Sequence, residues 1–186
     1  MKKKLCLSLL FALTAIGCGG RPANDASSAR PGMKRHAESG TCMATEVGPL
    51  HLQQEHEFGP ADSGVSLSDS GTDLLVTLYT YPAGSRAPTD QEYSDHFRQV
   101  LAEVAQSMKA NEFVVGRFKD PRFQRKGWLA LTQGELNGAP VIAVVHLLTN
   151  DRWYFKVRAT SPLAGDAEKT GNLTLAALSK SFNPCR

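Results

Sequence analysis

Residues 141–149 read Val-Ile-Ala-Val-Val-His-Leu-Leu-Thr, and this stretch decides the expected fold. Successive side chains of a strand point to opposite faces, so both faces of this strand are largely apolar. A strand of that kind must be covered on both sides. Asn137-Gly138 precedes it, and an Asn-Gly pair accepts the positive φ angles of a tight hairpin turn. We therefore expect a central strand in a sheet whose two faces are both covered.

Further strands are predicted from β-branched and aromatic content and from the turn residues between the segments. The expected strands are, in order, residues 47–58, 65–67, 74–81, 113–118, 128–136, 141–149 and 153–160. In the last of these, apolar residues alternate with polar ones. Lys156 and Arg158 therefore share a face that is at least partly in contact with water.

Two segments have the periodicity of helices. Residues 90–109 carry one apolar stripe, and Thr89 with Glu92 three residues later forms a capping box. Residues 166–182 carry a second apolar stripe. Its members are Leu175, Leu178 and Phe182. Laid against the strands, these helices predict an α+β fold, an antiparallel β-sheet meander flanked by helices in a three-layer sandwich. This element order is similar to that of the Mog1/PsbP-like fold over about residues 45–183, and the similarity implies no functional residue.

The first 17 residues have the three parts of an export signal. Three lysines are followed by an apolar stretch of about a dozen residues, which is shorter than the roughly 20 that a bilayer-spanning helix needs. Ala15-Ile16-Gly17-Cys18 then resembles the lipobox of bacterial lipoproteins. This resemblance implies a signal peptide at 1–17 and lipidation of Cys18. Gly19 after the cysteine implies sorting to the outer membrane, facing the periplasm.

The presequence departs from the usual lipobox at one position, where Ala15 stands in place of leucine. Ala15-x-Gly17 also fits ordinary signal cleavage at the same bond, so this alternative stays open. Residues 18–40 are rich in small and polar residues and predict a flexible tether after the lipidated cysteine. A single α+β domain is expected at 41–186.

The predicted export signal assigns a role to each of the four cysteines. Cys6 would leave with the signal and Cys18 would carry the lipid, which leaves Cys42 and Cys185. An oxidising compartment favours a disulfide between them, although two free thiols are the alternative. The closed loop would contain roughly 140 residues and would contribute about 4–5 kcal/mol on the loop-entropy model.

Charge excludes one class of partner. The chain has 21 basic and 18 acidic residues, but three lysines and no acid lie in residues 1–17, so the remainder carries 18 of each. A neutral domain gives no broad surface for neutralising phosphates, and we expect no nucleic-acid partner. Basic residues are concentrated only in the segment 117–126. Its five cations are Arg117, Lys119, Arg122, Arg125 and Lys126. This loop is either a soluble connection between strands or a site for an anionic envelope component or an envelope protein.

No motif indicates catalysis, a cofactor or a metal site. His51 and His56 would face opposite sides of a regular strand, which disfavours a metal pair. His96 falls between stripe residues and is expected to be exposed, and His146 is expected in the core rather than as a catalytic base. The favoured function is that of a membrane-anchored envelope lipoprotein with a non-enzymatic binding or accessory domain. The alternatives are a periplasm-facing hydrolase and a carrier of a small ligand.

Overall fold

The computed structural model describes residues 30–59, 61–150 and 152–185. Of these residues 49% lie in strands and 21% in helices. The strands are β1 Met33–Arg35, β2 Thr41–Ala44, β3 Glu46–Val47, β4 Leu50–Gly59, β5 Asp62–Asp69, β6 Leu74–Pro82, β7 Phe113–Phe118, β8 Gly127–Leu136, β9 Ala139–Thr149, β10 Trp153–Pro162 and β11 Asn183–Pro184. The helices are α1 Asp90–Met108 and α2 Ala167–Lys180. The predicted signal peptide 1–17, Cys18 and the beginning of the tether lie outside the described residues.

The strands form one large and one small sheet. Eight of them follow the order β3-β4-β5-β6-β10-β9-β8-β7, and each neighbouring pair is antiparallel. The predicted fold class, an α+β meander flanked by helices, is therefore wrong: the expected meander β7–β10 is one half of an eight-stranded sheet, and β structure dominates. The missed half includes β4, whose residues 53–57 read Gln-Gln-Glu-His-Glu. Backbone hydrogen bonds hold such a strand in the sheet, so its side chains need no hydrophobic pattern.

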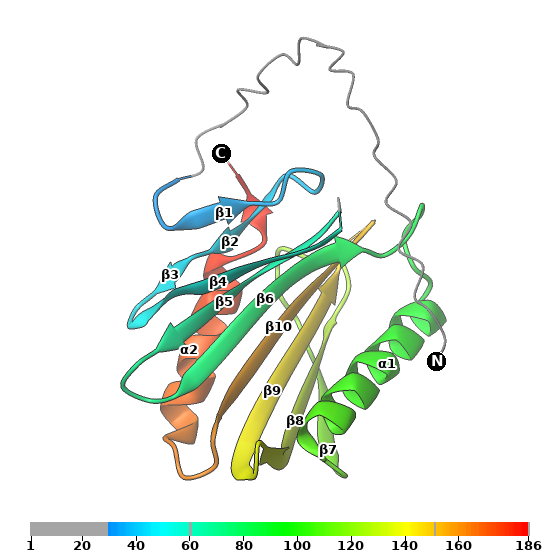
Figure 1. Cartoon of the computed structure of the whole chain (residues 1–186). Helices are drawn as coiled ribbons and strands as arrows, with labels where there is room; N and C mark the ends of the chain where they lie inside the picture. Colours follow the sequence, from blue (N-terminus) through cyan, green and yellow to red (C-terminus); the bar gives the residue numbers. More distant parts are fainter. Residues whose placement is uncertain (1–29, 60, 151, 186) are drawn as a thin grey trace, which may run out of the picture.

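Each helix covers only part of one face of the sheet, and Figure 1 shows the two helices on opposite faces. Helix α1 packs on β8 and β9 through one apolar cluster. Its predicted capping box is confirmed, since Glu92 N donates to Thr89 Oγ1 at 3.2 Å and Thr89 N donates to Glu92 Oε2 at 2.6 Å. Helix α2 packs on β6 and β10 from the other side.

The apolar stripe predicted for the second helix is wrong in part. Leu178 and Phe182 are buried, but Leu175 is 52% exposed. The buried face of α2 instead includes Thr170, Thr174 and Ala177, because small side chains let the helix approach the strands closely. Within the described chain, no helix combines the length and the apolar character that crossing a bilayer requires.

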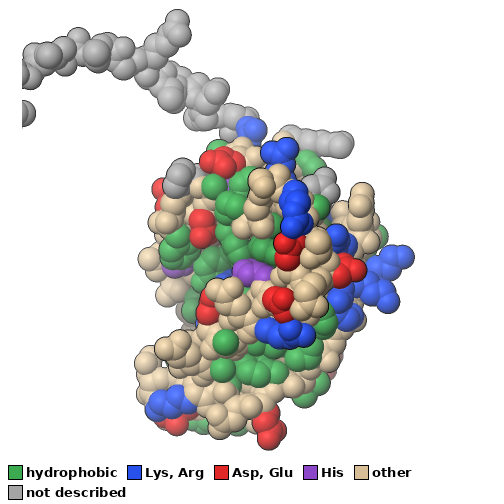
Figure 2. All heavy atoms as spheres, turned by 90° about the vertical axis from the view of Figure 1, so that its right-hand side faces the viewer, with side chains coloured by type: hydrophobic (Ala, Val, Ile, Leu, Met, Phe, Trp, Pro, Cys, Tyr) green, Lys and Arg blue, Asp and Glu red, His purple; other side chains and the backbone are tan. Residues whose placement is uncertain are grey.

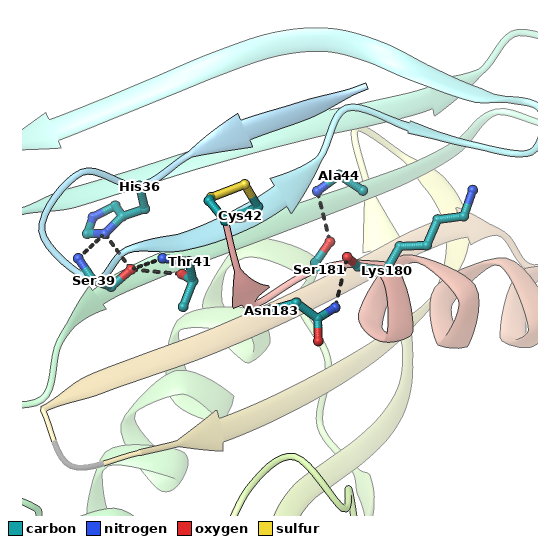
Figure 3. The surroundings of a disulfide bond; sticks show 9 residues. His36, Ser39, Thr41, Cys42, Ala44, Lys180, Ser181 and Asn183 are labelled. Atoms are coloured by element: carbon teal, nitrogen blue, oxygen red, sulfur yellow. Dashed lines mark hydrogen bonds between the residues drawn. A yellow bond between two sulfur atoms is a disulfide. The ribbon is translucent and has the colours of Figure 1, made fainter. Parts of the chain in front are cut away.

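The second sheet, of order β1-β2-β11, joins the beginning and the end of the described chain. The predicted disulfide between Cys42 and Cys185 is confirmed, with 5.3 Å between the Cα atoms. Figure 3 shows its surroundings, where Ser181 Oγ accepts a hydrogen bond from Ala44 N at 3.0 Å. β1 lies within the segment that the sequence assigned to the tether, and its pairing with β2 includes residues from Met33 onward in the folded part.

Candidate functional site: a groove on the open half of the sheet

The face of the sheet that carries α1 is only half covered. Helix α1 lies over β8 and β9 and reaches Tyr154 at the start of β10, while β6, β5 and β4 beyond it carry no helix on that face. The helix forms one wall and β4 forms the other. We call this depression the groove. Figure 2 shows the side of the molecule that carries α1, where histidine is visible at the surface among hydrophobic side chains.

Four strands supply the floor of the groove and the wall at β4 in strict register. One cross-strand row consists of Gln54, Ser66, Thr77 and Arg158. The neighbouring row consists of His56, Gly64, Tyr79 and Lys156. Adjacent rows lie two residues apart along each strand, which is about 7 Å. Side chains from strands that are far apart in sequence therefore meet in two parallel polar lines.

At one end the groove deepens into an aromatic hollow of about 350 Å³, lined by Tyr79, Tyr81, His96, Glu103 and Lys156 among others. Lys156 Nζ lies 4.5 Å from the centroid of the Tyr79 ring and 4.0 Å from Glu103 Oε2. Tyr81 Oη and His96 Nε2 are 2.9 Å apart and share a hydrogen bond. The ring of His96 also stacks on Tyr154, with 4.1 Å between the ring centroids. Lys156 and Glu103, and likewise Tyr81 and His96, are thus paired within this hollow.

Burial dominates the electrostatics of the aromatic hollow. It raises the pKa values of Tyr79 and Tyr81, and the charge of Glu103 raises that of Tyr81 further. Burial lowers the pKa of His96, and the positive charge of Lys156 acts in the same direction. Burial also lowers the pKa of Lys156, against the opposing effect of Glu103. The phenols therefore stay protonated at neutral pH, and His96 is disfavoured as a cation.

The other end of the groove is a larger, mostly apolar hollow of about 740 Å³. Its walls include Leu75, Leu136, Val141 and Pro162. Arg158 projects into this end and donates a hydrogen bond to Ser107 Oγ at 3.1 Å. Polar side chains of β4, β5, β6 and β10 also line this hollow, whose volume lies in the range of small-molecule binding sites.

Tyr79 lines both hollows, and the position of its ring depends on Gly64. Gly64 lies opposite Tyr79 in the register, and a Cβ atom placed on Gly64 would lie 3.0 Å from Tyr79 Cδ1 and 2.7 Å from the Leu78 carbonyl oxygen. The missing side chain lets the aromatic ring lie close to β5. Phe58 and His56 continue the aromatic surface, since their rings stack with 5.7 Å between centroids.

Three arginines of the predicted basic loop each contact a different part of the fold. Arg117 lies over the Trp128 ring, with 4.0 Å from its Cζ atom to the centroid. Arg122 pairs with Asp120 at 2.5 Å and donates to carbonyl groups at the end of α2. Arg125 donates to the Pro88 carbonyl. Three of the five cations therefore hold the fold together.

The remaining two cations of that loop, Lys119 and Lys126, are exposed. Lys119 lies beside a shallow depression against α2. The five residues do not converge on one site in the structure, and Lys156 and Arg158 belong to the groove rather than to this loop. A partner-binding role for the loop stays a prediction.

The positions of His51, His56 and His96 differ from those expected from the sequence. A β-bulge between Leu52 and Gln54 changes the alternation of β4, so His51 and His56 lie on the same face rather than on opposite faces. Among the residues that the structure describes, no group of three or more His, Cys, Asp or Glu side chains could hold a metal ion. His96 is half-buried in the groove, not exposed.

His146 lies in the core on the α2 face, as the sequence predicts. It is 4% exposed and contacts Phe118 edge-on, with 5.1 Å between ring centroids. Its Nδ1 atom has no hydrogen-bond partner among the described residues. Burial lowers its pKa to about 4. Within the described chain, no serine, threonine or cysteine side chain is hydrogen-bonded to His146.

Comparison of the chain with protein-family models and with curated protein sequences found no match. The two resemblances inferred from the sequence stay predictions. Sequence reasoning missed Tyr79, Tyr81, His96 and Glu103 as groove residues. The available signal was the alternation in 74–81, which puts both tyrosines on the face opposite Leu78, but only the pairing of β6 with β10 brings them beside Lys156.

Proposed function

We propose that this protein is a membrane-anchored lipoprotein of the bacterial envelope whose domain binds a ligand or partner in the groove. The observation that carries the binding role is the open half of the α1 face, where aromatic and cationic side chains line two adjoining hollows. A soluble domain gains nothing in stability from leaving such side chains beside an open depression, whereas a binding site needs them accessible.

The anchoring half of the proposal rests on the presequence. Lipid attached at Cys18 would hold the domain at a membrane surface, and the remaining tether would let it move there. The disulfide agrees with an exported location, because such bonds persist in oxidising compartments. The larger hollow contains a Ser66–His56 pair with 2.7 Å between Oγ and Nε2, but no Asp or Glu carboxylate of the described chain is hydrogen-bonded to that histidine, which favours a binding or accessory role over catalysis.

Anchoring is tested by growing cells with a radiolabelled fatty acid. The wild-type protein is expected to incorporate label and to sediment with membranes, and Cys18→Ser is expected to do neither. A wild-type protein without label, or with residues 1–17 still attached, would overturn the anchoring half of the proposal.

The binding role is tested by photo-crosslinking in intact cells. Phe58 at the rim is 62% exposed, so a photoreactive phenylalanine analogue can replace it with little disturbance. Val114, which is 72% exposed on β7 and outside the groove, provides the control position. We expect a mass-shifted adduct from position 58 and none from position 114. Equal adducts at both positions, or none at 58, would contradict a groove-specific partner.

A further inference from the structure

Arg158 has fewer partners than its burial leads one to expect. Its guanidinium makes one hydrogen bond, to Ser107 Oγ, and no Asp or Glu of the described chain forms an ion pair with it. Ser107 is itself oriented by donating to the Val104 carbonyl oxygen at 3.0 Å. By contrast, half-buried Arg125 has Asp90 Oδ1 at 3.5 Å. Burial lowers the pKa of Arg158, because the loss of water disfavours the charged guanidinium.

Further hydrogen-bonding groups stand in the same cross-strand row as Arg158. Thr77 is its direct neighbour on β6, and Ser66 is the next neighbour on β5. The two hydroxyls are 3.2 Å apart, and Ser66 Oγ lies 2.7 Å from His56 Nε2. When His56 Nε2 donates to Ser66, these two hydrogen bonds leave one hydroxyl hydrogen free, and a guanidinium beside one hydroxyl donor is a set that recognises the oxygens of an anion.

Apolar surface begins one row further along the strands. Leu75 on β6 lies two residues beyond Thr77, and Val141 and Pro162 face each other across β9 and β10. This shelf and the arginine row line the same hollow of about 740 Å³. A ligand that fills it would bring one polar end to Arg158 and an apolar body to the shelf.

The charged residues that line the hollow limit the polar end of a ligand to a single negative charge. One guanidinium faces the space, and the carboxylate of Asp73 lines the same hollow. A dianion would be left with a charge that no cation offsets. Lys156, in the neighbouring row, already lies against Glu103 and two tyrosine rings.

We propose that the apolar hollow binds an amphipathic monocarboxylate, whose carboxylate is held by Arg158 and the free hydroxyl hydrogen of the Ser66–Thr77 pair and whose hydrocarbon body lies on Leu75, Val141 and Pro162. This inference rests on the proposed binding role of the groove and names the class of its ligand. Acyl chains and short apolar peptides with a free carboxyl end share this chemistry, and the test includes both.

The test uses isothermal titration of the full chain carrying Cys18→Ser, which needs no detergent because it has no acyl group. The probes are decanoate below its micelle concentration, 1-decanol, acetate, and a trileucine peptide with a free or an amidated carboxyl end. We expect decanoate or the free-acid peptide to bind, and decanol, acetate and the amidated peptide to bind at least roughly tenfold more weakly, as the loss of a charge-assisted contact or of the apolar body predicts.

Two variants locate the site, and one variant serves as a control. Arg158→Gln is expected to weaken binding of the preferred acid roughly ten- to hundredfold. Ala139→Trp places a large side chain in the hollow from an exposed position and is expected to abolish binding without unfolding the protein. Arg98→Gln removes an exposed arginine outside the groove and should leave binding unchanged.

The outcomes separate this inference from the proposed function. Equal binding of decanoate and decanol, or unchanged binding in Arg158→Gln, would overturn the carboxylate site. Absence of binding by every probe, together with a groove adduct at position 58, would overturn the ligand class and leave the groove as the binding site. Absence of both would overturn the two proposals together. Preference for decanoate over the free-acid peptide would identify the acyl chain as the ligand, and the reverse preference would identify a peptide end.

Discussion

Removal of the disulfide is the perturbation whose effect can be worked most directly from the structure. Cys42 and Cys185 are 143 residues apart in sequence, so their bond closes a loop that contains nearly all of the described domain. On the loop-entropy model, closing a loop of this length destabilises the unfolded chain by about 5 kcal/mol at 25 °C. For a domain of this size, such a change lowers the melting temperature by roughly 10–20 °C.

The assay is urea unfolding followed by circular dichroism, with and without reductant, for the wild-type chain and for Cys42→Ala combined with Cys185→Ala. We expect reduction to lower the unfolding free energy of the wild type by about 5 kcal/mol and to leave the double variant unaffected. The unfolding free energy should also fall more steeply with urea concentration after reduction, because the opened chain exposes more surface when it unfolds. Coincident curves for oxidised and reduced wild type would refute the reasoning, since no covalent loop would then be acting on the unfolded state.

Three further predictions concern single side chains. Arg122→Gln removes the donor that satisfies three carbonyl groups around the end of α2 and should lower the unfolding free energy in urea by about 2–3 kcal/mol. Lys119→Gln, at an exposed position of the same loop, should change the unfolding free energy little. Equal losses in the two variants would contradict the stabilising role of Arg122. Burial depresses the pKa of His146 from 6.5 to about 4, so its contribution is complete above pH 6.5 and falls by about 3 kcal/mol as the pH drops to about 4. The pH dependence of the urea midpoint should flatten in this window in His146→Leu, and an unchanged slope would assign it to other groups. Gly64→Ala places a Cβ 2.7 Å from a backbone oxygen and should destabilise the protein by about 1–3 kcal/mol. Gly116→Ala, where nothing lies within 4 Å of the added atom, is the strand control, and similar midpoints for both would contradict the close approach.

The groove illustrates why sites of this kind escape sequence reasoning. The alternation in 153–160 placed Lys156 and Arg158 on one face, and the alternation in 74–81 separated Tyr79 and Tyr81 from Leu78. Neither pattern states which strands are neighbours. Arg158, Thr77 and Ser66 come together only because β10, β6 and β5 pair in one particular register. Antiparallel pairing between distant segments leaves no periodic trace in the sequence.

Local patterns by themselves determined the elements that depend on nearby residues: the capped helix α1, the β8–β9 hairpin at Asn137-Gly138 and the strand positions of the meander. Their physical causes, capping, turn conformation and the alternation of side chains, act within a few residues. The sequence also indicated the disulfide, because the predicted export leaves two cysteines in an oxidising compartment, which favours a bond between them.

Tertiary structure alone decided the size of the sheet and the place of the open face. The polar strand β4 joins the sheet through backbone hydrogen bonds, which every sequence can make, and a β-bulge in it turns His51 and His56 to one side. Helix α1 covers β8, β9 and the start of β10 and leaves β6, β5 and β4 bare on that face, because its buried stripe is only wide enough for part of an eight-stranded sheet. The groove is the surface that remains.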